Sequence, residues 1–539
     1  MTATKPVDEL ATVPAVPVPA LLDGAARRFG DRAAFVAGEQ SLSFTELWRH
    51  ACGFAHLLVE RGVRPGDVVG VHLPNCLAFP VAYYGALLAG ATFAPAGPLL
   101  PDEELRTQLA DAGVAAVVTF RPDLPDLPDA VVTQGQDLLA DLGGTPADAP
   151  PEVDVDPEVA IAHLAYTGGT TGRSKGVVLT HRNVVANVCQ YAQAGGSSPA
   201  VDIGGAVTFE QFSPPEEHPV RLGEGVAMAV APWFHAMGTI GMTIGLVAGA
   251  TAVIQQRFDP ARYLADAERH RATSLTGAPA MYHALLAHPD AATRDLTSVR
   301  GVTSGAAPMP VALAERIHAL MPDAVISEGY GLTEATMGLA ITPSGRSAHR
   351  RLGTVGLPVP GTEIAQLPVD AGRPGDDPVP PGEPGEIWAR GPQVMSGYLR
   401  RPEETDAVLV DGWLRTGDIG VIGDDGYLAV VDRAKDMLLY KGYNVFPREL
   451  EERLAAQPGV RQVAVVGVPD EEAGELPVAV LVGVDPDAVA GVVEAVNAEV
   501  RPYERLRRAH LADALPVSAA GKVLKRQLRE ELDEPVWTS

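Results

Sequence analysis

The most distinctive chemistry-bearing segment is residues 166–176, which reads Tyr-Thr-Gly-Gly-Thr-Thr-Gly-Arg-Ser-Lys-Gly and follows an apolar run over 159–165. Backbone N–H groups of a glycine-rich loop can wrap around a polyphosphate, and the ammonium of Lys175 adds a positive charge. The segment is not a Walker A loop, because no Gly-Lys-Ser/Thr closes it. It therefore indicates phosphate binding of another type, with a plain glycine-rich turn as the alternative.

Further segments place charged or hydroxyl side chains beside glycines. They are residues 304–308 (Ser-Gly-Ala-Ala-Pro), 328–334 (Glu-Gly-Tyr-Gly-Leu-Thr-Glu), 413–418 (Trp-Leu-Arg-Thr-Gly-Asp), 432–436 (Asp-Arg-Ala-Lys-Asp) and 521–522 (Gly-Lys). Their charged side chains include Glu334, Asp418 and Arg433, which could contact a bound ligand. Singly, each has a plainer explanation: Asp418 as a turn residue, Glu334 as a charge at a helix start, Arg433 as a surface cation.

In this order, the segments resemble those of the adenylate-forming superfamily, which includes acyl-CoA synthetases, peptide-synthetase adenylation domains and luciferases. The usual phosphate loop there is Tyr-Thr-Ser-Gly-Thr-Thr-Gly-x-Pro-Lys-Gly, so Gly168 replaces its serine and Ser174 its proline. The first replacement removes one hydroxyl contact to phosphate and leaves the rest of the pattern. The resemblance runs from Tyr166 to Lys522 and, with the flanking segments, covers nearly the whole chain.

The resemblance implies that ATP, Mg²⁺ and coenzyme A are bound. Tyr330 would stack on adenine, Thr333 would bond the α-phosphate and Glu334 would hold Mg²⁺. Asp418 and Arg433 would contact the ribose or a phosphate. The positions that the resemblance assigns to cofactors are Thr167, Gly168, Gly169, Thr170, Thr171, Gly172, Lys175, Gly305, Ala306, Ala307, Glu328, Gly329, Tyr330, Gly331, Asp418, Arg433, Lys435 and Gly442.

Lys522 matches the catalytic lysine that this family carries near its C-terminus. Its ammonium would lie between the substrate carboxylate and the α-phosphate, where two anionic reactants need charge neutralisation and in-line positioning. The resemblance makes Thr333, Glu334 and His235 catalytic as well. The plain alternative for Lys522 is an exposed lysine at the basic start of a helix.

A second half-reaction would use another face of the small domain. Lys435 matches the hinge residue about which that domain turns in the family. Gly442 would then line the pantetheine tunnel, because a side chain there would block the approaching thiol. A tight turn is the alternative explanation of Gly442.

His235 stands where amino-acid adenylation domains have an aspartate for the substrate's α-ammonium, so an α-amino acid is disfavoured. It resembles instead the gate between acyl pocket and thiol tunnel, with a packed core histidine as the alternative. The residues assigned to the acid are His235, Gly238, Thr239, Gly331 and Met337. Segment 436–449 is most similar to bacterial fatty-acyl-CoA ligases, and aryl-CoA ligases are the neighbouring branch.

Several activities share these motifs. An acyl- or aryl-CoA ligase acting on a small carboxylic acid is the first interpretation, and a standalone ligase that loads the thiol of an acyl carrier protein is the second. An amide ligase or a nitrite-activating diazotase would keep the ATP chemistry and change the acid or the nucleophile. A non-catalytic nucleotide-binding scaffold is disfavoured, since Thr333, Glu334, Asp418, Arg433 and Lys522 are all retained.

The net charge of −26 disfavours nucleic acid and anionic membranes as partners. The three cysteines, Cys52, Cys76 and Cys189, are far apart and lack metal-ligand spacing, which suits a reducing cytoplasm. The first twenty residues lack the basic start and apolar core of a signal peptide. Two uncharged stretches, 77–100 and 225–256, are interrupted by Gly and Pro, so we expect buried helices and strands in place of membrane spans.

The elements that must position these residues follow from periodicity. Ser43 to Glu46 has capping-box spacing and opens a helix, and residues 67–73 are typical of a buried strand. Repeated strand–helix alternation predicts an α/β fold with a large N-terminal domain of parallel-rich sheets flanked by helices. After residue 432 the pattern restarts as a small α+β domain, with a helix near 448–456 and strands over 463–468 and 478–484. We therefore expect an ATP- and acyl-binding domain, 1–432, and a mobile domain, 433–539, that carries Lys522. Proline-rich acidic loops are expected over 122–157 and 368–386.

Overall fold

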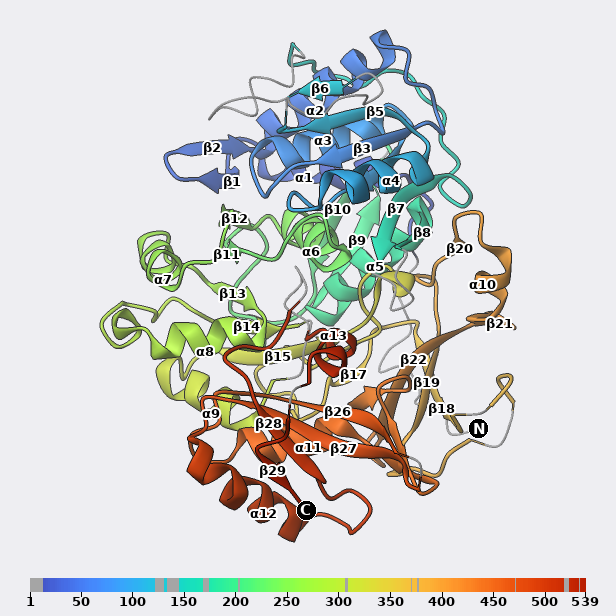
Figure 1. The fold of residues 1–539 in the computed structure, drawn as a ribbon. Helices are drawn as coiled ribbons and strands as arrows, with labels where there is room; N and C mark the ends of the chain where they lie inside the picture. The colour runs from blue at the N-terminus through green and yellow to red at the C-terminus, as the bar shows by residue number, and fades with distance from the viewer. Residues whose placement is uncertain are drawn as a thin grey trace. The chain divides into compact units, whose positions relative to one another are not determined.

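A computed structural model describes residues 13–121, 130–132 (backbone only), 145–167, 174–201, 204–305, 309–369, 371–375, 378–470, 472–517, 523–532 and 534–539. Packing divides the chain into two compact units (Figure 1). The large unit holds the described residues up to 364 together with 389–414, and the small unit holds 365–388 and 415–539. The chain crosses from one unit to the other after residues 364, 388 and 414, each time inside a strand. The small unit therefore begins earlier in the sequence than the predicted boundary at 432. The mobility of a domain 433–539 stays a prediction.

The first sheet of the large unit is parallel at its centre and antiparallel at its edges. Its strands in spatial order are β17 (Leu357–Pro358), β16 (Ala340–Ile341), β15 (Val325–Tyr330), β14 (Gly301–Ser304), β13 (Ser274–Gly277), β11 (Val226–Ala229), β12 (Thr251–Ile254), β1 (Ala33–Ala37) and β2 (Gln40–Ser43). Helices follow its strands in the chain: α6 (Ala236–Val247), α7 (Pro260–Arg269), α8 (Pro279–Ala287) and α9 (Val311–Leu320), with a 3₁₀ turn η2 (Pro289–Ala292). This is the strand–helix alternation expected from the sequence.

The second sheet of the large unit joins parallel strands to an antiparallel hairpin. In spatial order it contains β20 (Gly397–Tyr398), β8 (Lys175–Thr180), β7 (Ile161–Thr167), β4 (Thr92–Pro95), β3 (Val68–His72), β5 (Val114–Thr119) and β6 (Ala130–Val132). The remaining elements of this unit are α1 (Pro19–Phe29), α2 (Phe44–Glu60), α3 (Ala78–Leu88), α4 (Asp102–Ala112), α5 (His181–Ala194), α10 (Pro402–Asp406), a 3₁₀ turn η3 (Thr333–Ala335), and the hairpin β9 (Ser197–Val201) and β10 (Val207–Gln211).

Local signals of the sequence reappear in these elements. The capping box forms: Ser43 Oγ accepts from the backbone N–H of Glu46, and the Glu46 carboxylate accepts from the N–H of Ser43. One face of α2, with Leu47, Ala51, Phe54 and Leu58, is buried. Strand β3 confirms the prediction for 67–73. The expected loop over 122–157 lies mostly outside the described residues, and its described part includes the short strand β6.

Both uncharged stretches are folded into the core of the large unit. The first forms α3, whose residues are all buried, and β4. The second forms β11, α6 and β12. In the part of the chain that the structure describes, no helix is long and apolar enough to cross a membrane.

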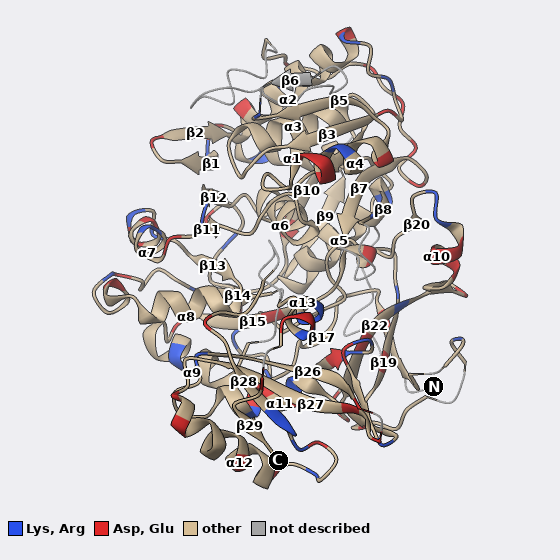
Figure 2. Ribbon diagram, viewed as in Figure 1, with Lys and Arg blue, Asp and Glu red and all other residues tan. Residues whose placement is uncertain are grey.

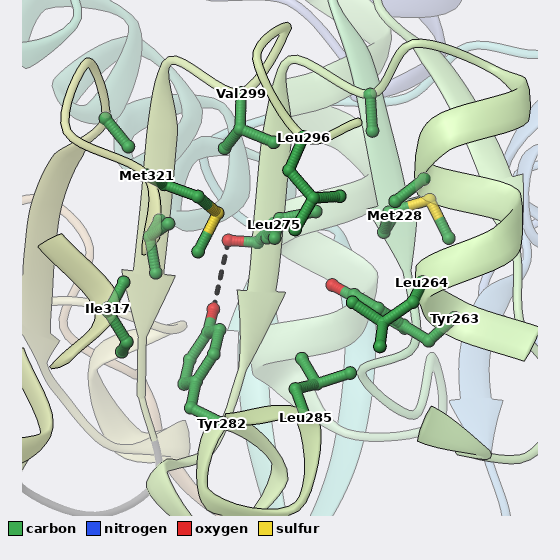
Figure 3. Close-up of a cluster of buried hydrophobic side chains, with 14 of the residues drawn as sticks. Met228, Tyr263, Leu264, Leu275, Tyr282, Leu285, Leu296, Val299, Ile317 and Met321 are labelled. Atoms are coloured by element: carbon green, nitrogen blue, oxygen red, sulfur yellow. Dashed lines mark hydrogen bonds between the residues drawn. The ribbon is translucent and has the colours of Figure 1, made fainter. Parts of the chain in front are cut away.

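A buried apolar cluster lies between the first sheet and the helices that follow its strands (Figure 3). Tyr263 and Tyr282 bring large side chains from α7 and α8, and Leu275 contributes from β13. The Tyr282 hydroxyl donates to the carbonyl oxygens of Leu275 (3.1 Å) and Thr303 (2.8 Å). Both buried phenols can therefore pack without an unsatisfied polar atom, since Tyr263 donates to the Thr276 carbonyl at 3.3 Å.

The small unit combines a sheet covered on both faces with strands that lead into it. The leading strands are β18 (Glu363–Leu367), β19 (Gly385–Arg390), β22 (Trp413–Ile422) and β23 (Leu428–Arg433). The short strand β21 (Leu409–Val410), which pairs with the start of β22, belongs to the large unit. The covered sheet contains β25 (Tyr443–Val445), β24 (Leu438–Tyr440), β27 (Gly474–Val482), β26 (Gln462–Asp470), β28 (Arg508–Leu511) and β29 (Trp537–Thr538). Its helices are α11 (Pro447–Ala455), α12 (Val489–Glu499) and α13 (Lys525–Glu530), with a 3₁₀ turn η4 (Pro486–Ala488).

Alternation along β26 explains why this sheet needs helices on both faces. Val465 packs in a cluster with Leu450 and Leu454 of α11, whereas its neighbours Ala464 and Val466 pack in a second cluster with Leu528 of α13. The predicted helix near 448–456 and the predicted strands at 463–468 and 478–484 are confirmed as α11, β26 and β27, with ends that differ by one to four residues.

Candidate active site

The phosphate-loop segment is a connection between two antiparallel strands of the large unit. Thr167, the last residue of β7, pairs with Lys175, the first residue of β8. The Ser174 hydroxyl donates to the Thr167 carbonyl at 2.7 Å and closes the base of the loop. The predicted residues Gly168, Gly169, Thr170, Thr171 and Gly172 lie outside the described residues.

Lys175 and Glu334 both contact Tyr398, Lys175 at the ring and Glu334 at the hydroxyl. The Lys175 ammonium lies 5.1 Å from the ring centroid of Tyr398, and it also forms an ion pair with Glu404 of α10, a helix whose acidic residues are visible in Figure 2. The Tyr398 hydroxyl donates to Glu334 Oε1 at 2.8 Å. The Lys175 ammonium and the Glu334 carboxylate thus both contact Tyr398. In this arrangement the ammonium can bind phosphate oxygens and the carboxylate can bind a cation.

The donor set suits Mg²⁺ bound mainly through phosphates. Within the described ranges, no group of three or more His, Cys, Asp and Glu could hold a metal ion. Mg²⁺ commonly binds through one or two carboxylates, substrate phosphates and waters, so the single half-buried carboxylate of Glu334 is sufficient.

The segments predicted to bind adenine come together at the ends of two parallel strands. Ser304 of β14 aligns with Glu328 of β15, so Gly305 and the Glu328–Gly331 segment leave the same edge of the sheet. Ligands of open α/β sheets bind outside such carboxyl ends. Glu328 Oε2 accepts a hydrogen bond from the N–H of Met309 at 2.9 Å, and Tyr330 is 9% exposed. Ala306 and Ala307 lie outside the described residues.

Gly331 and Met337 flank a strained turn that presents Thr333 and Glu334. A Cβ on Gly331 would lie 1.9 Å from the Met337 carbonyl oxygen, so only glycine allows this approach. Between them, Thr336 is fully buried at φ +63°, and its hydroxyl donates to the Gln393 carbonyl at 2.7 Å. Left-handed threonine is costly and occurs where surrounding contacts impose it, often at functional sites.

The acid-site residues of α6 divide into two groups. His235 is the N-cap residue, half-buried with its ring 4.3 Å from that of Phe234. Gly238 and Thr239 pack on the preceding turn: a Cβ on Gly238 would lie 2.0 Å from the Pro232 carbonyl oxygen, and the Thr239 hydroxyl donates to the Trp233 carbonyl. Their packing fixes the turn that presents His235.

Sequence reasoning missed two residues of this region, Met237 and Tyr398. Met237 of α6 lies next to Gly305, since its Sδ is 2.8 Å from the position of a Cβ on that glycine. Helix α6 therefore contacts the turn that is predicted to bind adenine. On the same helix, the added Cβ of Gly241 or Gly245 would have no described atom within 4 Å. The side of α6 that carries Met237, next to Gly305, is therefore apolar and has free space beside Gly241 and Gly245.

In the small unit, Asp418 and Arg433 are cross-strand neighbours. They pair in register on β22 and β23 and form an ion pair of 2.9 Å. Asp418 is 9% exposed, and its backbone N–H donates to Thr416 Oγ1 at 3.1 Å. The two residues that the sequence assigned to a ribose or phosphate are thus brought together.

Lys435 and Gly442 follow this strand pair. Lys435 is two residues beyond β23, in a turn where the N–H groups of Asp436 and Met437 both donate to the Arg433 carbonyl. Gly442 (φ 83°) and Lys441 (φ 50°) form the two-residue turn of the β24–β25 hairpin, which requires positive φ at both positions. Gly442 is therefore in a tight turn, and its role at the thiol stays a prediction. Lys522 lies outside the described residues.

Two family models match the chain. One, described as AMP-binding enzyme, matches residues 22–399, and the other, described as AMP-binding enzyme C-terminal domain, matches residues 449–522. The chain belongs to the AMP-binding enzyme family.

Relatives of this AMP-binding enzyme cover almost its whole length. A 4-coumarate–CoA ligase-like 6 protein of Oryza sativa subsp. japonica is 36% identical over 525 residues, which is 95% of this chain and 83% of the relative. A long-chain-fatty-acid–CoA ligase of Bacillus subtilis (strain 168) is 32% identical over 558 residues, with 95% and 94% covered. The crystal structure of ATP-bound MatB from Rhodopseudomonas palustris is similar with a TM-score of 0.83 at 27% identity, with 96% of this chain and 99% of that chain covered.

These matches decide several of the sequence predictions for the AMP-binding enzyme. The adenylate-forming family and the α/β fold with a large N-terminal and a smaller C-terminal part are confirmed. The predicted enzyme class, an acid–thiol ligase, is confirmed as well, since the relatives are CoA ligases. The roles of single residues stay predictions.

Proposed function

We propose that this chain is an ATP-dependent ligase that converts a hydrophobic carboxylic acid to its acyl-adenylate and transfers the acyl group to the thiol of coenzyme A. The observation that carries the proposal is the meeting of Lys175 and Glu334 at Tyr398 in the large unit. The names of the relatives, which are CoA ligases for coumarate-type and long-chain fatty acids, support the same reaction.

In the first half-reaction, a carboxylate oxygen of the acid attacks the α-phosphorus of ATP. The new P–O bond replaces the bond to the β-phosphate, and pyrophosphate leaves. Lys175 and Thr333 are the proposed contacts to the phosphates, and Glu334 is the proposed ligand of Mg²⁺, which when bound supplies positive charge to phosphate oxygens. Lys522 is the proposed cation between carboxylate and α-phosphate, and one preorganised charge of this kind is typically worth about 10²–10³ in rate.

In the second half-reaction, the thiol sulfur attacks the acyl carbonyl carbon. The acyl–phosphate bond breaks, AMP leaves with the electron pair of that bond, and the thiol proton passes to solvent or a base. We propose that the small unit turns about Lys435 for this step and that Gly442 then faces the thiol. His235, fixed as the N-cap of α6, is the proposed gate on the acyl side.

The acid is proposed to be a fatty or aryl acid. The face of α6 that continues from Gly305 carries Met237, Gly241 and Gly245 and offers an apolar surface with no charged side chain. A charged or α-amino acid would lose hydration there without a compensating partner. Buried, unpaired cysteines are compatible with the reducing cytoplasm, where we place the enzyme.

The test is pyrophosphate release over a panel of short, medium and long fatty acids, benzoates, cinnamates, amino acids and nitrite, with and without coenzyme A, with products identified by mass spectrometry. We expect one hydrophobic class to turn over fully only with coenzyme A and to give a thioester. Adenylate that accumulates unchanged in the presence of coenzyme A would contradict the proposed acceptor, and a parallel reaction with a holo-carrier protein would then identify a carrier loader.

A further inference from the structure

Helix α13 begins with a lysine that is half-buried and paired. Lys525 is its first residue, a position where the helix dipole disfavours a cation. Its side chain is nevertheless only 18% exposed, and its ammonium lies 2.8 Å from Glu451 Oε1 on α11. The same oxygen accepts a hydrogen bond from the N–H of Val465 on β26 at 2.7 Å. A half-buried pair at an unfavourable helix position needs a specific reason, because desolvating two charges is costly.

Two further carboxylates act on Lys525 from the segment around the proposed hinge. Asp432 is 7% exposed, and its carboxylate accepts from the N–H groups of Arg433 (2.8 Å) and Arg448 (3.0 Å). Burial lowers the pKa of Lys525, but the negative charges of Glu451, Asp432 and Asp436 raise it above its ordinary value. The ammonium therefore pairs with Glu451 in the electrostatic field of two further carboxylates, Asp432 and Asp436, both within three residues of Lys435.

The residues that flank 518–522 pair with each other. Val517 and Val523 form an antiparallel bridge, and the N–H of Leu524 donates to the Pro516 carbonyl at 2.8 Å. Val523 packs on the cluster that holds Leu528 of α13. Lys522 is thus covalently attached to a bridged residue and stands three residues before Lys525.

We infer that Lys525 is a positioning residue for adenylation: its ion pair with Glu451 of α11, a helix whose Arg448 N–H donates to Asp432 of β23, fixes the chain that carries Lys522 relative to that hinge-side strand. The inference rests on the proposed function, because it concerns the step that Lys522 serves. Lys525 touches no reacting atom. A displacement of about 1 Å in a reacting group can cost about 10²-fold in rate, so the two half-reactions should respond differently to the loss of this pair.

The test compares Lys525→Gln with Arg526→Gln in the full-length protein. Arg526 is the next residue of the same helix, is 72% exposed, and pairs across one turn with Glu530 at 3.1 Å, so the control removes the same charge from the solvent side. Each variant is assayed for acid-dependent pyrophosphate release and, separately, for thiolysis of a synthetic acyl-adenylate by coenzyme A. We expect Lys525→Gln to lower the kcat of adenylation by about ten- to a hundredfold with unchanged KM for ATP and acid, and to leave thiolysis unchanged. Arg526→Gln should change neither step.

Further variants and outcomes bear on the inference. Lys525→Arg should recover most of the adenylation rate, and Glu451→Gln combined with Lys525→Gln should be no slower than either single variant, because both remove one interaction. Equal loss of both half-reactions, or loss that follows a drop in the thermal midpoint, would show a purely structural role and overturn the inference. Full adenylation in Lys525→Gln would overturn it as well. If the wild-type protein itself forms no adenylate with any acid, the proposed function fails instead.

Discussion

The hydroxyl of Tyr398 donates a 2.8 Å hydrogen bond to the carboxylate of Glu334, although the two residues are 64 positions apart in the chain. Tyr398 reaches this place because β20 pairs antiparallel with β8, the strand that begins at Lys175. The phosphate-loop lysine and the proposed magnesium ligand are therefore oriented by one phenol.

Replacing Tyr398 with phenylalanine should slow adenylation. The variant keeps the ring beside Lys175 and removes only the hydrogen bond to a charged carboxylate, an interaction typically worth about 1.5–3 kcal/mol. We expect pyrophosphate release to fall by about ten- to a hundredfold, with a raised Mg²⁺ concentration for half-maximal rate. Tyr263→Phe is the matched control, since it removes a phenol hydroxyl whose bond to the Thr276 carbonyl is long, at 3.3 Å, and far from Lys175 in the sequence. Equal Mg²⁺ dependence in Tyr398→Phe and wild type would contradict the orienting role.

Replacing Asp418 with asparagine should weaken ATP binding. The change preserves size and removes the charge that pairs with Arg433 at 2.9 Å and that would accept ribose hydroxyls. Arg433 is 45% exposed, so the ion pair itself contributes little to stability. We expect the KM for ATP to rise by about tenfold, as for loss of one charge-assisted hydrogen bond, with little change in thermal midpoint. An unchanged KM for ATP, measured by initial rates of pyrophosphate release, would contradict the proposed role of Asp418 in ATP binding.

Features that neighbouring residues encode could be predicted from the sequence, whereas features that depend on tertiary contacts could not. The capping box at Ser43 and the alternation of Ala464, Val465 and Val466 are encoded within a few residues, so α2 and β26 could be predicted. Tyr398 could not, because its position depends on a two-residue strand paired with residues more than 200 positions earlier. The left-handed Thr336 was also missed, since threonine gives no local signal for positive φ.

The same limit applies to the domain division. The sequence marks where the small α+β pattern restarts, near residue 432. It does not reveal that residues 365–388 and 415–431 pack with that pattern, because strands β19 and β22 meet only in the folded chain.

Acidification should destabilise the large unit through His181. Its Nδ1 accepts the backbone N–H of Val18 at 3.0 Å, and burial lowers its pKa from 6.5 to about 4. Because the folded pKa is lower than the unfolded one, the unfolded chain takes up the proton first as the pH falls. The stabilisation is complete above pH 6.5 and is lost between pH 6.5 and 4, in total about 3 kcal/mol.

The measurement is the thermal midpoint of His181→Gln against pH, with His318→Gln as the control because His318 is exposed on α9. The wild type and the control should lose stability together as the pH falls, whereas His181→Gln should start lower at neutral pH and fall less steeply. Parallel curves for all three proteins would show that His181 does not contribute to the pH dependence.

Replacing Lys522 with alanine should abolish adenylate formation and spare thiolysis of a supplied acyl-adenylate. The proposed ammonium neutralises two anions only in the first half-reaction, so its loss should cost about 10²–10³ or more in that step alone. Pyrophosphate release and thiolysis are measured on the same preparation. A variant with normal pyrophosphate release would refute the proposed role.

Replacing Gly442 with leucine should block thiolysis selectively, and the small unit offers a close control in Gly459. Both glycines have nearly the same backbone, φ 83° and φ 85°, and for both an added Cβ would meet no described atom within 4 Å. A leucine in this left-handed conformation costs about 1–2 kcal/mol at either position, so the two variants should lose similar stability. Only Gly442 lies in the β24–β25 turn that is proposed to face the thiol. Gly442→Leu should therefore form adenylate normally and transfer it to coenzyme A poorly, whereas Gly459→Leu should do both. If both variants lose thiolysis equally, strain in the small unit explains the loss and the tunnel role of Gly442 is wrong.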